Sequence, residues 1–330
     1  MSMDIINVKD YDITKNKLSG FSYWRLGGIM PRIDDVILNS SIYLYPSVLE
    51  ARAGEKAGGS GCIVSVESGV VPYLYAVTNS HVIRDELGNS PVIRINTTDG
   101  KTDIIEYTQR NWICHPDGDD LAIAPLSIEA TRHKYSRIPT DRFINQQIIL
   151  DYDIGAGDEV FMVGRFVGYD GKQQNEPTVR FGNLSLGKHV FIRNEDLGIE
   201  QESFLIETRS LPGYSGSPVF LEILPYTWRK GSRTKGSLII PGQYKINGKP
   251  ADVGPWLLGV DWGHTFLYEK VLEKNKRDEV SGGWVVKSNS GTACVVPAWK
   301  LLDLLNMEEF VNMRKKNDDV VKKRGKLVSH

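Results

Sequence analysis

The chain has 330 residues, of which 41% are apolar and 25% charged, a balance typical of a globular protein with a large core. The formal net charge of −1 gives no overall attraction to nucleic acid, and no apolar run approaches the length of a membrane-spanning helix. We therefore expect neither nucleic acid nor a membrane among its partners.

The first half of the chain divides into a leader and a β-rich segment. In residues 1–35, lysines lie beside Tyr23 and Trp24. We expect this leader to be a strap across the fold, with an arm for a partner as the alternative. Residues 36–150 contain short apolar runs separated by glycine-containing turns, which predicts a first antiparallel β-barrel. These runs cover 36–38, 41–45, 62–66 and 73–77.

A histidine and two acids stand at the ends of apolar runs in this segment. Residues 73–77 run into a small polar stretch that ends at His81, and Asp119 and Asp120 directly precede the apolar run 121–124. A histidine and a carboxylate are the base and the orienting acid that a nucleophilic serine requires. Taken singly, each residue is more often a turn or cap residue, so the pair gains its meaning only in combination with a serine nucleophile.

Residues 151–297 repeat the β-rich pattern and predict a second barrel, with runs at 159–163, 179–182 and 204–206. This segment contains Gly-Tyr-Ser-Gly-Ser-Pro at 213–218, followed by an apolar run. Gly213 permits a tight turn in which its own N–H and that of Ser215 point to one place, as an oxyanion site requires. The order His81, Asp120, Ser215 favours a catalytic triad over three unrelated turn residues.

Two features come after the serine in the chain. Residues 222–256 form a charged insertion with a hairpin expected at 246–248, and it is either a lid or docking surface or a plain surface hairpin. After Pro297, leucines recur at helical spacing, so residues 298–330 are expected to form a closing helix and a basic tail. We expect the tail beyond Met313 to be an exposed, frayed terminus rather than a binding arm.

Together these motifs resemble the chymotrypsin/trypsin-like serine proteases over roughly residues 36–305. The forms TNSHV at 78–82 and GYSGSPVF at 213–220 most resemble the bacterial glutamyl endopeptidase branch. The resemblance implies an all-β fold of two antiparallel β-barrels of the chymotrypsin type with a C-terminal helix, and an active site between the barrels. It implies that His81 is the general base and Ser215 the nucleophile, with the N–H groups of Gly213 and Ser215 as the oxyanion hole. Asp120 is preferred over Asp119 as the orienting acid, because the family places its acid directly before the Leu-Ala strand.

The same resemblance points to a substrate site. LGVDWG at 258–263 is similar to the strand beside the specificity pocket, whose backbone pairs with an extended substrate. Trp262 and Gly263 would then bind substrate, together with Thr292 on the last barrel strand, 291–296. Arg209 stands near the position of the pocket floor. A cation at Arg209 favours acidic substrate side chains, a carboxylate at Asp261 favours basic ones, and pairing of the two would leave a neutral pocket. These three alternatives stay open.

One departure from the resemblance concerns activation. In secreted zymogens of the family, an Asp before the nucleophile pairs with a newly cut N-terminus. Tyr214 stands there in this chain and cannot make that ion pair. We therefore expect no activation by cleavage near the N-terminus, and restraint by narrow specificity or by a regulatory protein partner instead.

The sequence as a whole predicts a serine endopeptidase that hydrolyses a protein or peptide substrate through an acyl-enzyme. Three cysteines do not make a secreted disulfide framework, and no signal peptide is evident, so we expect a cytoplasmic protein. Cys114 and His115 have no second ligand pair at metal spacing, so we expect no metal and no organic cofactor. The alternative is a catalytically vestigial, protease-like module that only binds peptides.

Overall fold

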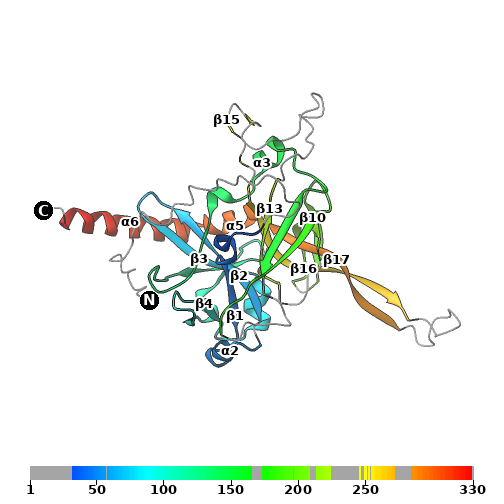
Figure 1. Cartoon of the computed structure of the whole chain (residues 1–330), viewed down its shortest axis with the longest axis horizontal. Helices are drawn as coiled ribbons and strands as arrows, with labels where there is room; N and C mark the ends of the chain where they lie inside the picture. The colour runs from blue at the N-terminus through cyan, green and yellow to red at the C-terminus, as the bar shows by residue number, and fades with distance from the viewer. Residues whose placement is uncertain are drawn as a thin grey trace.

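The computed structural model describes residues 32–56, 58–165, 173–195, 197–208, 213–223, 245–246, 249–250, 252, 254–271 and 284–328. Two β-sheets, built from successive parts of the chain, make up most of the molecule, and helices close the C-terminal end (Figure 1). The expected all-β class with C-terminal helices is confirmed.

The first sheet is a curled half-barrel of eight strands. Its strands are β1 (Ser41–Tyr45), β2 (Gly59–Glu67), β3 (Pro72–Thr78), β4 (Val92–Asn96), β5 (Thr102–Glu106), β6 (Ile113–Cys114), β7 (Ala122–Leu126) and β8 (Ile138–Pro139). They lie in the order β5-β4-β1-β2-β3-β7-β6, and β8 pairs with β2. β3 and β7 are therefore neighbours, although three other strands lie between them in the chain.

The second sheet closes into a six-stranded barrel. Its strands are β9 (Glu159–Gly164), β10 (Thr178–Leu184), β11 (Val190–Asn194), β12 (Ile199–Glu207), β13 (Pro218–Leu221), β16 (Trp256–Lys270) and β17 (Val285–Pro297). The order is β10-β9-β13-β16-β17-β12-β11, and the additional pairing of β10 with β12 joins the two ends. β11 lies outside the ring, on β12. Closure leaves the ring without an edge strand.

Short helices connect the strands, and one of them corrects the sequence analysis. They are α1 (Asp35–Leu38), α2 (Val48–Ala53), the π-helix η2 (Val82–Glu86), the 3₁₀ helices η3 (Gln109–Asn111) and η4 (Thr140–Arg142), and α3 (Gln146–Asp151). The strand expected over 36–38 is wrong, because this segment is helical. The carboxylate of Asp34 accepts a hydrogen bond from the N–H of Val36 at 2.9 Å, which caps the helix at its start.

One apolar core joins the two sheets. The largest cluster of buried side chains contains Val64 and Tyr75 of the first sheet, Phe161 and Val260 of the second, and Leu301 of the C-terminal helix α5 (Ala298–Leu305). A core shared in this way couples the two sheets, because neither can expose its inner face without uncovering part of the other.

The C-terminal segment is more ordered than the sequence analysis predicted. A second helix, α6 (Glu308–Val328), continues well past Met313, so the expectation of a frayed tail from that point is wrong. Arg314 is buried and donates hydrogen bonds to the hydroxyl of Tyr75 and the carbonyl of Leu305, both at 2.9 Å. The carboxylate of Asp318 accepts a hydrogen bond from the hydroxyl of Tyr73 at 2.7 Å. The apolar anchor Phe310 is buried in the core as well, but the polar and charged sequence after Met313 gives no sign of these contacts.

The last two strands extend beyond the barrel. The distal halves of β16 and β17 remain paired and project from the body as a two-stranded ribbon (Figure 1). In the insertion, Ile246 pairs with Lys249, which is the expected hairpin, formed by β14 (Lys245–Ile246) and β15 (Lys249–Pro250). Most of the insertion and residues 1–31 of the leader lie outside the described residues. Within the described part of the chain, no helix is both long and apolar enough to cross a membrane.

Candidate active site

His81 and Asp120 come together because the strands that carry them are antiparallel neighbours. Thr78 at the end of β3 pairs with Ala122 at the start of β7. The residues that come after β3 and those that precede β7 therefore meet at one end of the sheet. Nδ1 of His81 lies 2.6 Å from Oδ2 of Asp120, and that carboxylate is fully buried.

Further donors hold the Asp120 carboxylate in place. Its Oδ1 accepts hydrogen bonds from the hydroxyl of Ser80 at 2.7 Å and from the N–H of His81 at 3.0 Å. The side-chain amide of Asn79 donates to the carbonyl of Asp120 at 2.7 Å, which fixes the backbone as well. A buried carboxylate requires such partners. The small polar residues before His81 therefore keep the acid oriented toward the imidazole.

Asp119 faces a different set of groups. Its Oδ1 accepts from the side-chain amide of Gln201 at 2.7 Å, and its Oδ2 lies 3.1 Å from Nζ of Lys300 and 3.3 Å from Nδ1 of His115. Burial alone lowers the pKa of Lys300, but Asp119 and the nearby Glu202 outweigh it and raise that pKa above its ordinary value. Asp119 is thus paired with the C-terminal helix, whereas Asp120 is the acid that contacts His81.

The serine turn is held against the first sheet. Gly213 and Gly216 have positive φ angles of 90° and 88°, which favour glycine. The hydroxyl of Ser60, on β2, donates to the carbonyl of Gly213 at 2.9 Å, and the N–H of Ser60 donates to the carbonyl of Ser215 at 2.9 Å. The turn that carries Ser215 therefore bridges the two sheets.

Close packing fixes the position of this turn relative to β3. A Cβ at Gly216 would lie 2.0 Å from the carbonyl oxygen of Ser60 and 2.4 Å from Oγ1 of Thr78. Thr78 is the last residue of β3, three positions before His81. The structure thus brings the turn of Ser215 to the end of the strand that leads into His81.

Tyr214, next to the serine, is anchored in the second barrel. Its side chain is buried, its hydroxyl is hydrogen bonded to the hydroxyl of Thr178, and the guanidinium carbon of Arg180 lies 4.7 Å from its ring centroid. These contacts anchor the turn to β10 of the second sheet.

The predicted substrate residues occupy the adjoining strand. The N–H of Gly216 donates to the carbonyl of Asp261 at 2.9 Å, so the start of the Asp261–Gly263 segment touches the serine turn. The Asp261 side chain is buried; burial, with the charge of Asp261, raises the pKa of Cys294 to about 12. The indole N–H of Trp262 donates to the hydroxyl of Ser203 at 3.0 Å, and a Cβ at Gly263 would meet no atom within 4 Å.

The structure says less about Thr292 and Arg209, the other two predicted substrate residues. Thr292 is half-buried on β17, where it pairs with Glu207. Arg209 lies outside the described residues, so the preference that depends on it stays a prediction. No group of three or more metal-type ligands occurs among the residues that the structure describes.

Glu86 also lies beside His81, although no sequence motif points to it. This carboxylate lies at the end of η2, and its Oε1 is 3.9 Å from Nε2 of His81, on the ring edge opposite Asp120. Burial raises the pKa of Glu86, and the nearby His81 partly opposes that shift. A π-helical turn brings residue i+5 back toward residue i, but nothing in this short sequence marks the turn as π rather than α.

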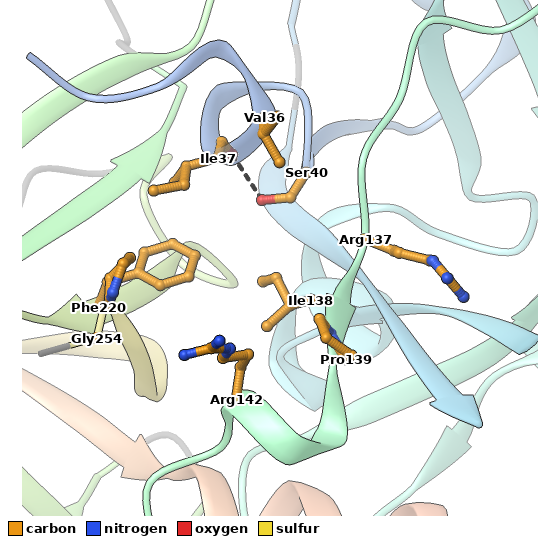
Figure 2. Close-up of a pocket in the computed structure, with 10 residues that line it drawn as sticks. Val36, Ile37, Ser40, Arg137, Ile138, Pro139, Arg142, Phe220 and Gly254 are labelled. Atoms are coloured by element: carbon orange, nitrogen blue, oxygen red, sulfur yellow. Dashed lines mark hydrogen bonds between the residues drawn. The ribbon is translucent and has the colours of Figure 1, made fainter. Parts of the chain in front are cut away.

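A small apolar cavity lies elsewhere between the sheets. Figure 2 shows Ile37, Ile138 and Phe220 around it, with Arg137 and Arg142 at its rim. Its volume is about 50 Å³, room for one or two water molecules. The two arginines are already paired, with Glu67 at 2.8 Å and Asp252 at 2.5 Å. None of its lining residues belongs to the site around His81.

A closed six-stranded barrel, a curled half-barrel and C-terminal helices match the chymotrypsin-like fold. Residues 59–222 match the family model of the trypsin-like peptidase domain, and the match spans both the histidine segment and the serine turn. It supports a chymotrypsin/trypsin-like protease family for this chain. A search of curated proteins found no match.

Proposed function

We propose that the chain is a serine endopeptidase in which Ser215, His81 and Asp120 act together. The observation that carries the proposal is the 2.6 Å contact between His81 Nδ1 and a buried Asp120, at the end of the sheet that holds the serine turn. A carboxylate at Nδ1 keeps the proton on that nitrogen, which leaves Nε2 as the base.

The proposed reaction is acyl transfer in two stages. Nε2 of His81 accepts the hydroxyl proton of Ser215 as Oγ attacks the substrate carbonyl. The N–H groups of Gly213 and Ser215 stabilise the negative oxygen, and the imidazolium then protonates the leaving amine. Water attacks the acyl-enzyme by the same proton transfers in reverse, which restores the serine.

The partner in this proposal is a protein or peptide, and the compartment is the cytoplasm, in keeping with three free cysteines. The motif forms at His81 and Ser215 support a relation to the bacterial glutamyl endopeptidase branch. The preference of that branch for glutamate does not extend to this proposal, because Asp261 stands before Trp262 where the branch has histidine.

Labelling with a fluorophosphonate, followed by peptide mapping, tests the nucleophile. Wild type should be labelled at Ser215, and Ser215→Ala should lower peptide turnover by roughly 10⁶. Ser217→Ala is a matched control, because Ser217 is a buried serine two residues away whose hydroxyl has no hydrogen-bond partner among the described residues. Undiminished turnover in Ser215→Ala, or labelling elsewhere, would refute the proposal, and absent labelling of folded wild type would favour the vestigial binding module.

A further inference from the structure

The ribbon formed by residues 266–270 of β16 and 285–289 of β17 exposes large apolar side chains. Tyr268 is 65% exposed and Trp284, beside the ribbon, is 68% exposed. The other exposed apolar side chains here are Phe266, Leu267, Val285 and Val286. A two-stranded ribbon in water is marginally stable by itself, and clustered apolar exposure is typical of an interaction surface.

The two faces of the ribbon differ in charge. Residues paired directly across antiparallel strands share a face, and alternate residues along a strand share it too. One face therefore carries Phe266, Tyr268 and Lys270 of β16 with Val285 and Lys287 of β17. Nζ of Lys287 lies 3.5 Å from the centroid of the Phe266 ring. This face is apolar and cationic and has no acid among the described residues, whereas Glu269 lies on the other face.

Among the residues that the structure describes, no strand pairs with the outer edge of β16 along the ribbon. β13 pairs with β16 only as far as Val260, and Asp261 hydrogen bonds to the serine turn. Beyond Asp261, β17 is the only strand paired with β16 in the described part of the chain. The N–H of Val271 donates to the carbonyl of Trp284 at 2.9 Å. By the alternation of an antiparallel ladder, the N–H groups of Phe266 and Tyr268 then point away from β17, toward the outer edge of β16.

This edge is continuous with the proposed substrate strand. β16 touches the serine turn at Asp261 and continues as one strand through Trp262 and Gly263 into the ribbon, with register shifts at 261–263 and 264–266. On the basis of the proposed function, we propose that the ribbon is an extended docking site. It takes an extended segment of the protein substrate, rich in apolar and acidic side chains, by strand addition to the outer edge of β16.

The direction of β16 also predicts where in the substrate the docked segment lies relative to the cleaved bond. The strands that flank β16 both run antiparallel to it, and a substrate strand added in the same sense points its carboxyl end toward Ser215. Each substrate residue matches about one residue of β16. The docked segment therefore precedes the cleaved bond by roughly five to nine residues, with its carboxylates on the side of Lys287.

The test compares peptides that share one cleavable core, taken from a peptide-library cleavage profile. The extended peptide carries alternating aspartate and phenylalanine or leucine about five to nine residues before the bond. Control peptides carry lysine in place of aspartate, or the acidic segment after the bond. We expect at least a tenfold higher kcat/KM for the acidic, upstream extension than for the core alone, and no such gain for either control. Equal values for the extended peptide and the core would overturn the proposal.

Variants of the ribbon distinguish the contribution of the backbone N–H groups at the edge of β16 from that of the side chains. Tyr268→Pro removes an N–H at the outer edge of β16 and leaves the β16–β17 hydrogen bonds intact, so it should abolish the tenfold gain. Tyr268→Ser keeps that N–H and should retain part of the gain. Val285→Pro is the matched control, because its N–H lies on the opposite edge of the ribbon, and it should keep the gain. Lys287→Glu, on the same face of the ribbon, should reverse the preference between the acidic and the lysine-containing extensions.

Two readouts keep this test apart from the test of catalysis. Fluorophosphonate labelling of Ser215 in every ribbon variant shows that the site around the serine is intact. Fluorescence anisotropy of the labelled extension peptide with full-length Ser215→Ala measures docking without turnover. If Tyr268→Pro does not weaken binding of the extension peptide, the docking proposal is refuted even if catalysis is confirmed. If wild type is not labelled at Ser215, the proposed function fails on its own.

Discussion

At the scale of single residues, the two neighbouring aspartates should behave differently. Asp120 contacts the imidazole, so Asp120→Asn should lower turnover by around 10⁴ through the wrong histidine tautomer. Asp119 pairs with Lys300, so Asp119→Asn should cost far less turnover and act mainly on stability, because it leaves Lys300 without its nearest partner. Turnover and urea unfolding of both variants check this, and the reverse ranking of turnover would assign the orienting role to Asp119.

Glu86 should shift the pH dependence of turnover. The rate needs a neutral imidazole, so it should rise with pH to a plateau, with its midpoint at roughly 6–7. A negative Glu86 at 3.9 Å favours the imidazolium and moves that midpoint up. Glu86→Gln should therefore move the midpoint down by about 0.2–0.7 pH units, within the range of a partly exposed ion pair.

The environment of Glu86 supplies the control for this shift. Besides His81, the charged groups that act on Glu86 are Asp85, Asp120 and Arg165. Asp85 is exposed on the same helical turn, and no ion pair joins it to His81 among the described residues. Asp85→Asn should thus move the midpoint much less than Glu86→Gln. Equal shifts in the two variants would mean that Glu86 acts on His81 only through the summed negative charge of the nearby acids, and not through its contact with Nε2.

At the scale of elements, the docking of α6 should contribute measurably to stability. Arg314 makes two hydrogen bonds from a buried position, so Arg314→Met should lower the free energy of unfolding by about 1.5–3 kcal/mol. The exposed neighbour Lys315 is the matched control, and Lys315→Met should stay within about 0.5 kcal/mol of wild type. Urea denaturation measures both. A loss no larger than that of the control would mean that α6 is held by its apolar contacts alone.

The sequence predicts best those elements whose chemistry is local. Apolar runs bounded by turns predict β1, β2, β3 and β9, and the small polar stretch before His81 points to the contact with Asp120. The features that escape prediction depend on partners distant in the chain. Arg314 contacts Tyr75, and Lys300 contacts Asp119, only in the complete fold, because the partners are far apart in the chain. The ribbon escapes because its side chains resemble those of a buried strand, and a strand pattern does not say whether a partner covers it.

At the scale of the whole molecule, the two sheets should be coupled through Ser60. This buried side chain donates to Gly213 of the serine turn and accepts from the N–H of Arg165, at 2.9 and 3.0 Å. Ser60→Ala should cost about 1–3 kcal/mol of stability and also lower turnover, because the turn loses its tether. Ser65→Ala changes a buried serine on the same strand whose bond goes to Glu67, and it should leave turnover unchanged. Equal turnover of the two variants would contradict the coupling.

The hydrogen bond between Gly216 and Asp261 also sets an order in time. Asp261 is synthesised 45 residues after Gly216 (261 − 216), so at about 5–20 residues per second the serine turn waits roughly 2–9 seconds for the strand that supports it. A nascent chain therefore cannot complete the proposed site until β16 has been made. Ribosome-stalled chains that end before β16 should accordingly escape fluorophosphonate labelling, whereas released full-length chains should react.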